Sequence, residues 1–233
     1  MILSAHQPAY LPWLGYLHKI AICDIFVILD DVQFEKNSFT NRNKIKTPQG
    51  EHWLTIPVQN KSHLEKVISQ LEIDNKTSWR DKHRKTISQI YKKAPFYKEF
   101  ADWLEKIYSQ EWTNLVDLTE QMNDHFLKQI GITTKLIRQS ELNCSKKKQE
   151  LILELCEKTK ADIYISGSLG KNYIDPQYFT DHGIRIYFQE YHHPAYPQLY
   201  GEFLPYMSCL DLLMNVGEKQ ALEIIFEGND RTV

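Results

Sequence analysis

The sequence predicts an α/β protein whose mostly parallel sheet is flanked by helices and interrupted by a helical insertion. Short, continuous apolar runs such as residues 25–29 and 161–165 are typical of strands buried on both faces, as in parallel sheets covered by helices. Segments with apolar residues at helical spacing lie between these runs. Polar residues directly follow the apolar runs, and in open α/β sheets ligands bind beyond the carboxyl ends of the strands.

The first forty residues set this arrangement. A short apolar run, residues 1–3, leads through polar residues 4–7 to Pro8, and residues 10–22 carry apolar side chains at helical spacing. Residues 25–29 then form a second strand that ends on an acidic pair. We therefore expect strand, loop, helix and strand, with one edge of the sheet presenting the four side chains His6, Gln7, Asp30 and Asp31.

This opening unit is similar to the start of the HxGH nucleotidylyl-transferring folds, in which histidines at a helix N-terminus stabilise phosphates. The similarity is partial, because Ala9 stands where the second histidine would be and no KMSKS-type segment follows. It is an analogy at the level of the fold and implies no specific reaction.

A short basic region follows the second strand. Its cations are Lys36, Arg42, Lys44 and Lys46, and Asn37, Asn41 and Asn43 add amides. A turn at residues 48–50 separates two extended runs, and residues 53–58 read as a strand with Pro57 near its end. The region is either a β-hairpin with a solvated face or an anion-binding arm near the two aspartates. Residues 59–77 alternate polar and apolar residues, as at residues 67–68 and 71–73, and read as one more short strand.

Residues 78–130 carry helical patterns broken at residues 94–96 and 113–114, with Gly131 ending the last helix. Their mixed charges are typical of solvated faces, and His125 is expected to be structural. We expect three helices that form a lid or a flanking subdomain.

The remaining chain alternates strands and helices again: strands at residues 132–137, 161–165 and 183–188, and helices at 146–159 and 209–215. The strand at 161–165 delivers a glycine-rich turn, residues 166–173, whose amides and Lys171 would suit a phosphate, although the P-loop spacing is absent. The expected parts are therefore an N-terminal α/β part with the basic arm (1–77), a helical insertion or lid (78–131), a C-terminal α/β part (132–226) and a disordered tail (227–233).

The amino-acid composition limits the classes of function that the protein can have. The 233 residues are 42% hydrophobic and 25% charged, with a net charge of −2, so no overall field favours nucleic acid or an anionic membrane. Four scattered cysteines without paired metal spacing read as reduced thiols. No signal peptide or membrane-spanning run is evident, which predicts a cytoplasmic protein without nucleic-acid partners or membrane insertion. The 13 tyrosines and 5 tryptophans suit either a core or a stacking site for sugars or bases.

Several segments together resemble the WbqC-like family, and the resemblance covers nearly the whole chain. They are residues 6–8 (HQP), 10–13 (YLPW), 15–16 (GY), 30–34 (DDVQF), 41–43 (NRN), 53–58 (WLTIPV), 166–173 (SGSLGKNY), 196–198 (YPQ) and 208–215 (SCLDLLMN). Met214 stands where the family tends to place Phe, a packing exchange. The resemblance implies a role in bacterial surface-polysaccharide biosynthesis, meaning lipopolysaccharide and its O-antigen.

Two hypotheses follow. The first is an enzyme, a transferase or ligase, that modifies a sugar precursor, for example by acyl or aminoacyl transfer to an amino sugar from a phosphate-containing donor. The second is a non-catalytic nucleotide- or sugar-binding scaffold protein of a polysaccharide assembly complex. Binding of ATP or a nucleotide sugar discriminates between them, and the cofactor, donor, acceptor and oligomeric state are left open.

For the enzyme, His6 would act on phosphate or as general base, and Asp30 or Asp31, with a slight preference for Asp30, would bind a divalent cation or an amine. The candidate substrate-binding residues are Gln7, Tyr10, Trp13, Lys36, Asn41, Arg42, Asn43, Ser166, Gly167, Lys171, Tyr173, Gln189, Tyr191, Tyr196 and Gln198. If the strands are parallel, we expect His6, Asp30, Arg42, Ser166, Lys171 and Tyr191 to line one cleft.

Overall fold

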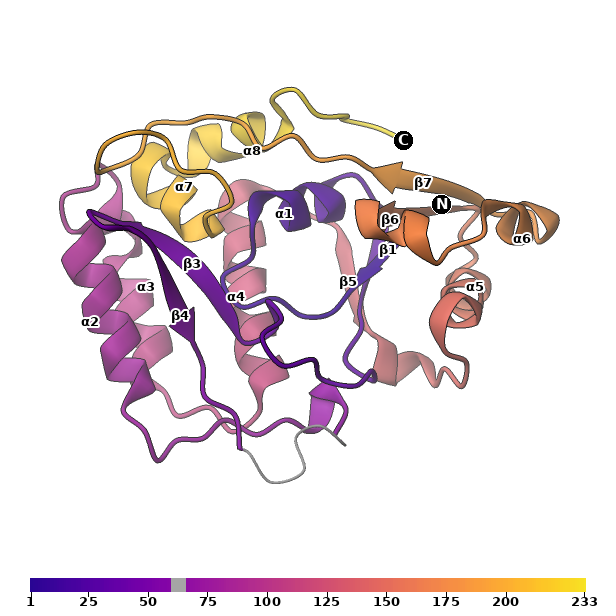
Figure 1. Ribbon diagram of the computed structural model, residues 1–233, viewed down its shortest axis with the longest axis horizontal. Coiled ribbons are helices and arrows are strands. Elements are labelled where there is room, and N and C mark those ends of the chain that lie inside the picture. The colour runs from indigo at the N-terminus through magenta and orange to yellow at the C-terminus, as the bar shows by residue number, and fades with distance from the viewer. Residues whose placement is uncertain (60–65) are drawn as a thin grey trace.

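The architecture is a parallel sheet between two groups of helices. The computed structural model describes residues 1–59 and 66–233. Within these residues, five parallel strands form a sheet in the order β5-β2-β1-β6-β7, and two antiparallel strands form a separate hairpin (Figure 1). The sheet strands are β1 Ile2–His6, β2 Ile25–Ile28, β5 Lys135–Arg138, β6 Ile163–Gly167 and β7 Arg185–Gln189, and the hairpin strands are β3 Arg42–Thr47 and β4 Gly50–Thr55. The predicted α/β class is confirmed.

Helices account for most of the remaining described chain. The α-helices are α1 Leu14–Ala21, α2 Trp79–Tyr91, α3 Tyr97–Ser109, α4 Leu115–Ile130, α5 Lys148–Thr159, α6 Pro176–Asp181, α7 Cys209–Val216 and α8 Glu218–Phe226. Single 3-10 turns are η1 Ile68–Gln70, η2 Gln139–Leu142 and η3 Ser168–Asn172. The three helices expected between residues 78 and 130 are α2, α3 and α4, and Gly131 ends α4 with a φ of 84°.

The sheet buries both of its faces because alternate residues of its strands point to opposite sides. Leu3, Ala5 and Val27 belong to a hydrophobic cluster with residues of α5 and α6. Phe26 and Ile28, their neighbours in β2, belong to a larger cluster built with α1, α2, α3, α4, α7 and α8. Figure 1 shows α5 and α6 on one side of the sheet and α1, α4 and α7 on the other.

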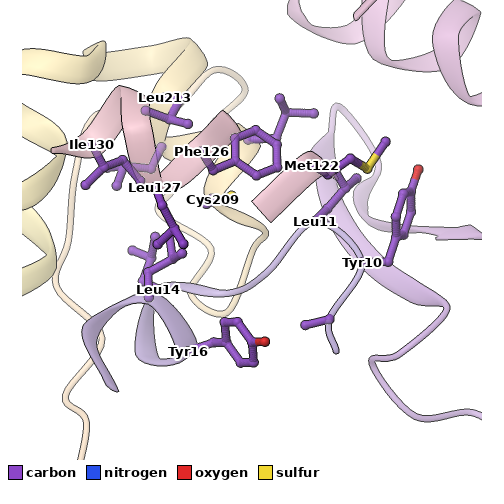
Figure 2. Close-up of a cluster of buried hydrophobic side chains, with 14 of the residues drawn as sticks. Tyr10, Leu11, Leu14, Tyr16, Met122, Phe126, Leu127, Ile130, Cys209 and Leu213 are labelled. Carbon is purple, nitrogen blue, oxygen red and sulfur yellow. The ribbon is translucent and has the colours of Figure 1, made fainter. Parts of the chain in front are cut away.

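The larger cluster joins the start of the chain to helices distant in sequence. Figure 2 shows Leu11 beside Met122 and Leu14 beside Leu127, both of α4, in a cluster that also includes Leu213 of α7, and each of these side chains is buried. Burial of one such side chain contributes roughly 1.5–3 kcal/mol to folding. The helices of residues 79–130 therefore share a core with the N-terminal part, while the division of the chain at residues 77, 131 and 226 stays a prediction.

The first helix begins later than the sequence predicts. Residues 7–13 form a loop in which Leu11 adopts a φ of 47°, a conformation rarely taken by residues other than glycine. The Asn43 side chain donates a hydrogen bond to the Leu11 carbonyl and holds this turn in place. Trp13 is the N-cap residue and α1 begins at Leu14. A tertiary hydrogen bond from the hairpin thus decides where the helix starts.

Two expectations are corrected. The strand expected within residues 59–77 is wrong where the structure describes it: residues 67–73 form η1 and isolated bridges, and Ile68 and Leu71 are buried three residues apart, a spacing that suits a 3-10 turn. Residues 60–65 of that range lie outside the described residues. The helix expected at residues 209–215 is α7, but α8 follows it after Gly217, whose φ is 77°. Near the C-terminus, the Asp230 carbonyl oxygen accepts a hydrogen bond from the His18 ring at 2.7 Å, and the disorder expected for residues 227–233 stays a prediction.

Candidate functional site

The carboxyl ends of the five strands form one edge of the sheet. His6 of β1 is in register with Ile28 of β2, and Gly167 of β6 is in register with Gln189 of β7. Because β1 and β6 also run parallel, with Ser4 opposite Ile165, His6 and Ser166 lie at the same end. The condition set for a shared site, that these strands be parallel, is therefore met. The single cleft lined by six residues stays a prediction.

His6 sits in an aromatic enclosure at the centre of this edge. Its ring makes edge contacts with Trp13 and Tyr16, each at 5.4 Å between ring centroids. Nδ1 lies 3.0 Å from the backbone oxygen of Gln7, so in the neutral ring Nδ1 carries the proton and Nε2 keeps its lone pair. Burial, reinforced by the charge of Lys19, lowers the pKa of His6 to about 3 despite the Gln7 carbonyl. His6 is therefore a neutral hydrogen-bond acceptor at pH 7, and its expected action on phosphate or as general base stays a prediction.

Lys19 is a residue that the sequence reasoning missed. It lies on α1, is only 4% exposed, and its Nζ donates a hydrogen bond to the Ala5 carbonyl of β1 at 3.2 Å. Burial lowers its pKa to about 8. The signal was present in the sequence, since Lys19 is the one Lys, Arg, Asp or Glu residue in a helix whose other positions are almost all buried.

An aromatic row extends from the His6 enclosure along the basic arm and the hairpin. Phe39 lies 5.1 Å from Trp13 and 5.9 Å from Trp53 between ring centroids, and Phe39 is 39% exposed. The Arg42 guanidinium stacks over Trp53 at 4.3 Å from the ring centroid. These half-buried and exposed rings, Trp13, Phe39 and Trp53, form what we call the aromatic row, a surface suited to stacking on a flat ligand.

The polar side chains of the arm mainly fix its shape. Arg42 donates from Nε and Nη2 to the Asn37 carbonyl, at 3.1 and 2.7 Å. Asn41 is buried and donates to the Ile56 carbonyl at 2.8 Å, while buried Asn43 holds Leu11 as described. Thr40 donates to the side-chain oxygen of Gln7 at 3.2 Å. Lys36 is exposed on the same arm, and its anion-binding role stays a prediction.

The two aspartates have different surroundings. Asp30 is completely buried, and its carboxylate accepts hydrogen bonds from the backbone amide and hydroxyl of Ser140, at 2.9 and 2.7 Å. Asp31 is exposed and lines a cleft of about 720 Å³. The slight preference for Asp30 as the residue facing the site is therefore not supported, because Asp30 joins β2 to η2 while Asp31 is accessible.

The glycine-rich segment after β6 is a 3-10 turn, η3. A Cβ added at Gly170 would lie 2.0 Å from the Ser166 hydroxyl, so only glycine fits the turn as it stands. Lys171 pairs with Glu190, which is an exposed ion pair of little energetic weight. Tyr173 is 60% exposed and Gly167 partly exposed, so access to this turn from solvent remains. Phosphate binding here stays a prediction.

Four other expected binding residues have structural partners. Tyr10 is fully buried and its hydroxyl lies 2.8 Å from His83 Nδ1. Tyr196 and Gln198 both donate to Asp211, a buried carboxylate of α7, at 2.9 and 2.7 Å. The Gln189 amide donates to the Gly15 carbonyl at 3.0 Å and ties β7 to α1.

Tyr191 also packs within the fold. Its ring lies 5.2 Å from His18 and its hydroxyl donates to the Ile225 carbonyl at 3.1 Å. Burial therefore removes the rings of Tyr10 and Tyr196 from a stacking role, and the aromatic row is the accessible aromatic surface near His6. The sequence alone does not separate buried from exposed tyrosines.

Neither a metal centre nor a membrane span is found in the part of the chain that the structure describes. No group of three or more His, Cys, Asp or Glu side chains there is arranged to hold a metal ion. None of the described helices is both long and apolar enough to cross a bilayer.

Comparison with known proteins places this geometry in a family. The model of the WbqC-like protein family matches residues 7–223, a range that begins directly after β1 and includes the aromatic row and the other four strands of the sheet. The chain belongs to the WbqC-like protein family. It is 38% identical over 213 residues to the uncharacterized protein Rv1507c of Mycobacterium tuberculosis, covering 91% of this chain and 92% of that protein. No solved structure matches the chain. The resemblance expected from the sequence motifs is therefore confirmed, and membership alone assigns no reaction.

Proposed function

We propose that the protein is a cytoplasmic transferase or ligase of surface-polysaccharide (lipopolysaccharide, O-antigen) biosynthesis that modifies a small sugar or nucleotide-linked sugar precursor. Acyl or aminoacyl transfer to an amino sugar is the reaction that the site suits best. The observation that carries the proposal is the neutral His6 imidazole, enclosed by Trp13 and Tyr16 at the carboxyl edge of a parallel sheet. WbqC-like membership supports the setting.

The proposed roles follow from the contacts. The aromatic row would stack on the apolar face of the sugar ring. Nε2 of His6 would accept a hydrogen bond from the sugar amine and orient its lone pair for attack on the acyl carbonyl. As the C–N bond forms, the bond between the acyl carbon and the donor would break, the donor's phosphate or thiolate would leave with that electron pair, and His6 would pass the amine proton on to this leaving group. Lys19, with a pKa of about 8, would still be mostly protonated at pH 7, and its positive charge would help to keep the His6 ring neutral.

Measurements of binding and of acyl transfer distinguish the proposed binding role of Trp13 from the proposed catalytic role of His6. Titration of the full chain with a nucleotide-linked amino sugar, followed by calorimetry and tryptophan fluorescence, should show binding that Trp13→Ala weakens by about tenfold. Trp103→Phe is the control, because Trp103 stacks on His125 at 4.2 Å between α3 and α4, on elements outside the sheet edge. His6→Ala should retain binding and lose acyl transfer.

Two results would contradict the proposal. The absence of binding by any nucleotide, sugar or nucleotide sugar at millimolar concentration removes the sugar-modifying role. Binding by the native chain without transfer from ATP-activated or coenzyme-linked acyl donors favours the alternative, a non-catalytic binding protein of an assembly complex, for which the exposed Phe39 would be part of the ligand surface.

A further inference from the structure

A second cleft lies beside the candidate site, at the carboxyl ends of β2 and β5. It has a volume of about 720 Å³, within the range of small-molecule sites. Its lining includes Asp31, which follows β2, Gln139, which follows β5, and the three consecutive lysines Lys146, Lys147 and Lys148. We call it the lysine cleft. None of the residues that the sequence motifs assign to a ligand, apart from Asp31, lines it.

The charge of the lysine cleft is positive. The three lysines are consecutive at the start of α5, a helix of 12 residues, and all three are exposed. In the described parts of the chain, no carboxylate lies within ion-pair distance of any of them. Asp31 in the lining and Glu154 beside Lys146 contribute two negative charges against three positive ones. The cleft therefore favours an anion, and the N-terminal end of α5 adds to the same preference.

The Glu154 carboxylate occupies two of the backbone N–H donors that precede α5. Its carboxylate accepts hydrogen bonds from the amides of Ser145 and Lys146, at 2.9 Å each to Oε2. The anion would consequently be held by lysine side chains more than by these amides. This favours a ligand with dispersed charge, such as a phosphate ester, over a small ion cradled by backbone.

Gln139 supplies the second, independent observation. It is only 3% exposed, and its side-chain oxygen is buried without a hydrogen-bond partner. An unpaired buried polar atom is unfavourable by about 1–3 kcal/mol, so native proteins rarely keep one without a purpose. Because Gln139 lines the cleft, a rotation of its terminal amide would turn this oxygen towards the cleft, where a ligand that donates a hydrogen bond would satisfy it. The ligand therefore carries a hydroxyl or amino group as well as an anionic group.

We propose that the lysine cleft binds a phosphorylated, hydroxyl-bearing small molecule, with its phosphate on Lys146–Lys148 and a hydroxyl on Gln139. A sugar phosphate and a nucleotide share this chemistry. The proposal rests on the residues of the cleft alone and does not require the His6 chemistry proposed above. The cleft adjoins the strand next to β1, so its ligand would lie on the same edge of the sheet as the His6 enclosure.

Binding to the full chain tests the proposal by isothermal titration with glucose 1-phosphate, uridine diphosphate, glucose and uridine. The first two should bind, with affinity that falls as salt rises, and the unphosphorylated pair should not. Preference for one phosphorylated probe identifies sugar phosphate or nucleotide as the source. The triple variant Lys146→Ala, Lys147→Ala, Lys148→Ala should weaken binding by about tenfold or more.

The matched control is the double variant Lys92→Ala, Lys93→Ala, which removes adjacent exposed lysines at the end of α2. It should bind like the native chain. Gln139→Leu should fold at least as stably, because it removes the unpaired oxygen, yet bind the hydroxyl-bearing phosphates about tenfold more weakly while leaving inorganic phosphate unaffected.

His6→Ala should not change binding in the lysine cleft, so failure of the proposed function and failure of this inference give different results. The inference is overturned if neither phosphorylated probe binds at millimolar concentration. It is also overturned if the triple lysine variant binds as the native chain does while its melting temperature is unchanged.

Discussion

Replacement of Lys19 by methionine is expected to stabilise the protein. The pKa of Lys19 falls from its usual 10.5 to about 8. Because one pKa unit corresponds to about 1.4 kcal/mol, the buried ammonium is less favourable than in water by about 3 kcal/mol at pH 7. Methionine keeps an unbranched chain of similar length and loses one hydrogen bond, to the Ala5 carbonyl, of about 1 kcal/mol. The net expectation is a gain of about 1–3 kcal/mol in the free energy of unfolding.

The stability difference between Lys19→Met and the native protein should depend on pH. Between pH 8 and 10.5 the folded lysine is neutral while the unfolded lysine still binds a proton, so the native protein gains stability as pH rises. The advantage of Lys19→Met should therefore shrink across this interval. Urea denaturation followed by tryptophan fluorescence at pH 7 and at pH 10 measures both values.

A different result would refute the reasoning. If Lys19→Met is destabilised equally at pH 7 and pH 10, the lysine contributes by packing and its ammonium carries no desolvation penalty. If the variant is more stable but loses acyl transfer, the unfavourable lysine is retained for the chemistry beside His6, consistent with strain and instability at functional sites.

Two further predictions concern buried polar groups. Ser140→Ala removes one hydrogen bond from the buried Asp30 carboxylate and should lower the free energy of unfolding by about 1.5–3 kcal/mol, measured by urea denaturation; no change would mean that water replaces the hydroxyl. The lowered pKa values of His6 and His83, about 3 and about 4, mean that below pH 6.5 the unfolded chain binds protons that the folded chain does not. Stability should therefore fall as pH drops from 6.5 towards 4, by up to about 1.4 kcal/mol per pH unit for each histidine, and His83→Gln should flatten the slope of melting temperature against pH. A melting temperature that stays constant between pH 7 and pH 5 would contradict the neutral, buried state of both rings.

Local patterns predicted the sheet and most helices because each buried element carries its own periodicity. The run at residues 25–29 became β2, and the pattern at 146–159 became α5. The start of α1 was not predictable, because it depends on the hydrogen bond from Asn43, which lies far along the chain. The turn η1 was misread as a strand because Ile68, Leu71 and Ile73 are buried at spacings that local sequence does not assign uniquely.

The candidate site was predicted less completely than the fold, because it too depends on contacts between residues that are distant in the chain. Strand order and direction brought His6 and Ser166 to one edge, as parallel pairing requires. Burial determines which of the other predicted residues are accessible to a ligand. The Asp30 carboxylate is hydrogen-bonded to Ser140, and the Tyr10 hydroxyl is hydrogen-bonded to His83 and Tyr108. Such partners are set by tertiary contacts that no spacing in the sequence reveals.

The central place of β1 in the sheet also orders the formation of the native state. One edge of β1 pairs with β2, which follows within thirty residues, but the other edge pairs with β6 and stays open until the ribosome has delivered residues up to 167. Until then an apolar strand edge is unprotected, which invites pairing with other chains. Contacts this distant also slow folding, because a long loop must close first. Of the five sheet strands, the one that carries His6 is therefore synthesised before the other four, yet its pairing is completed only when β6 is available.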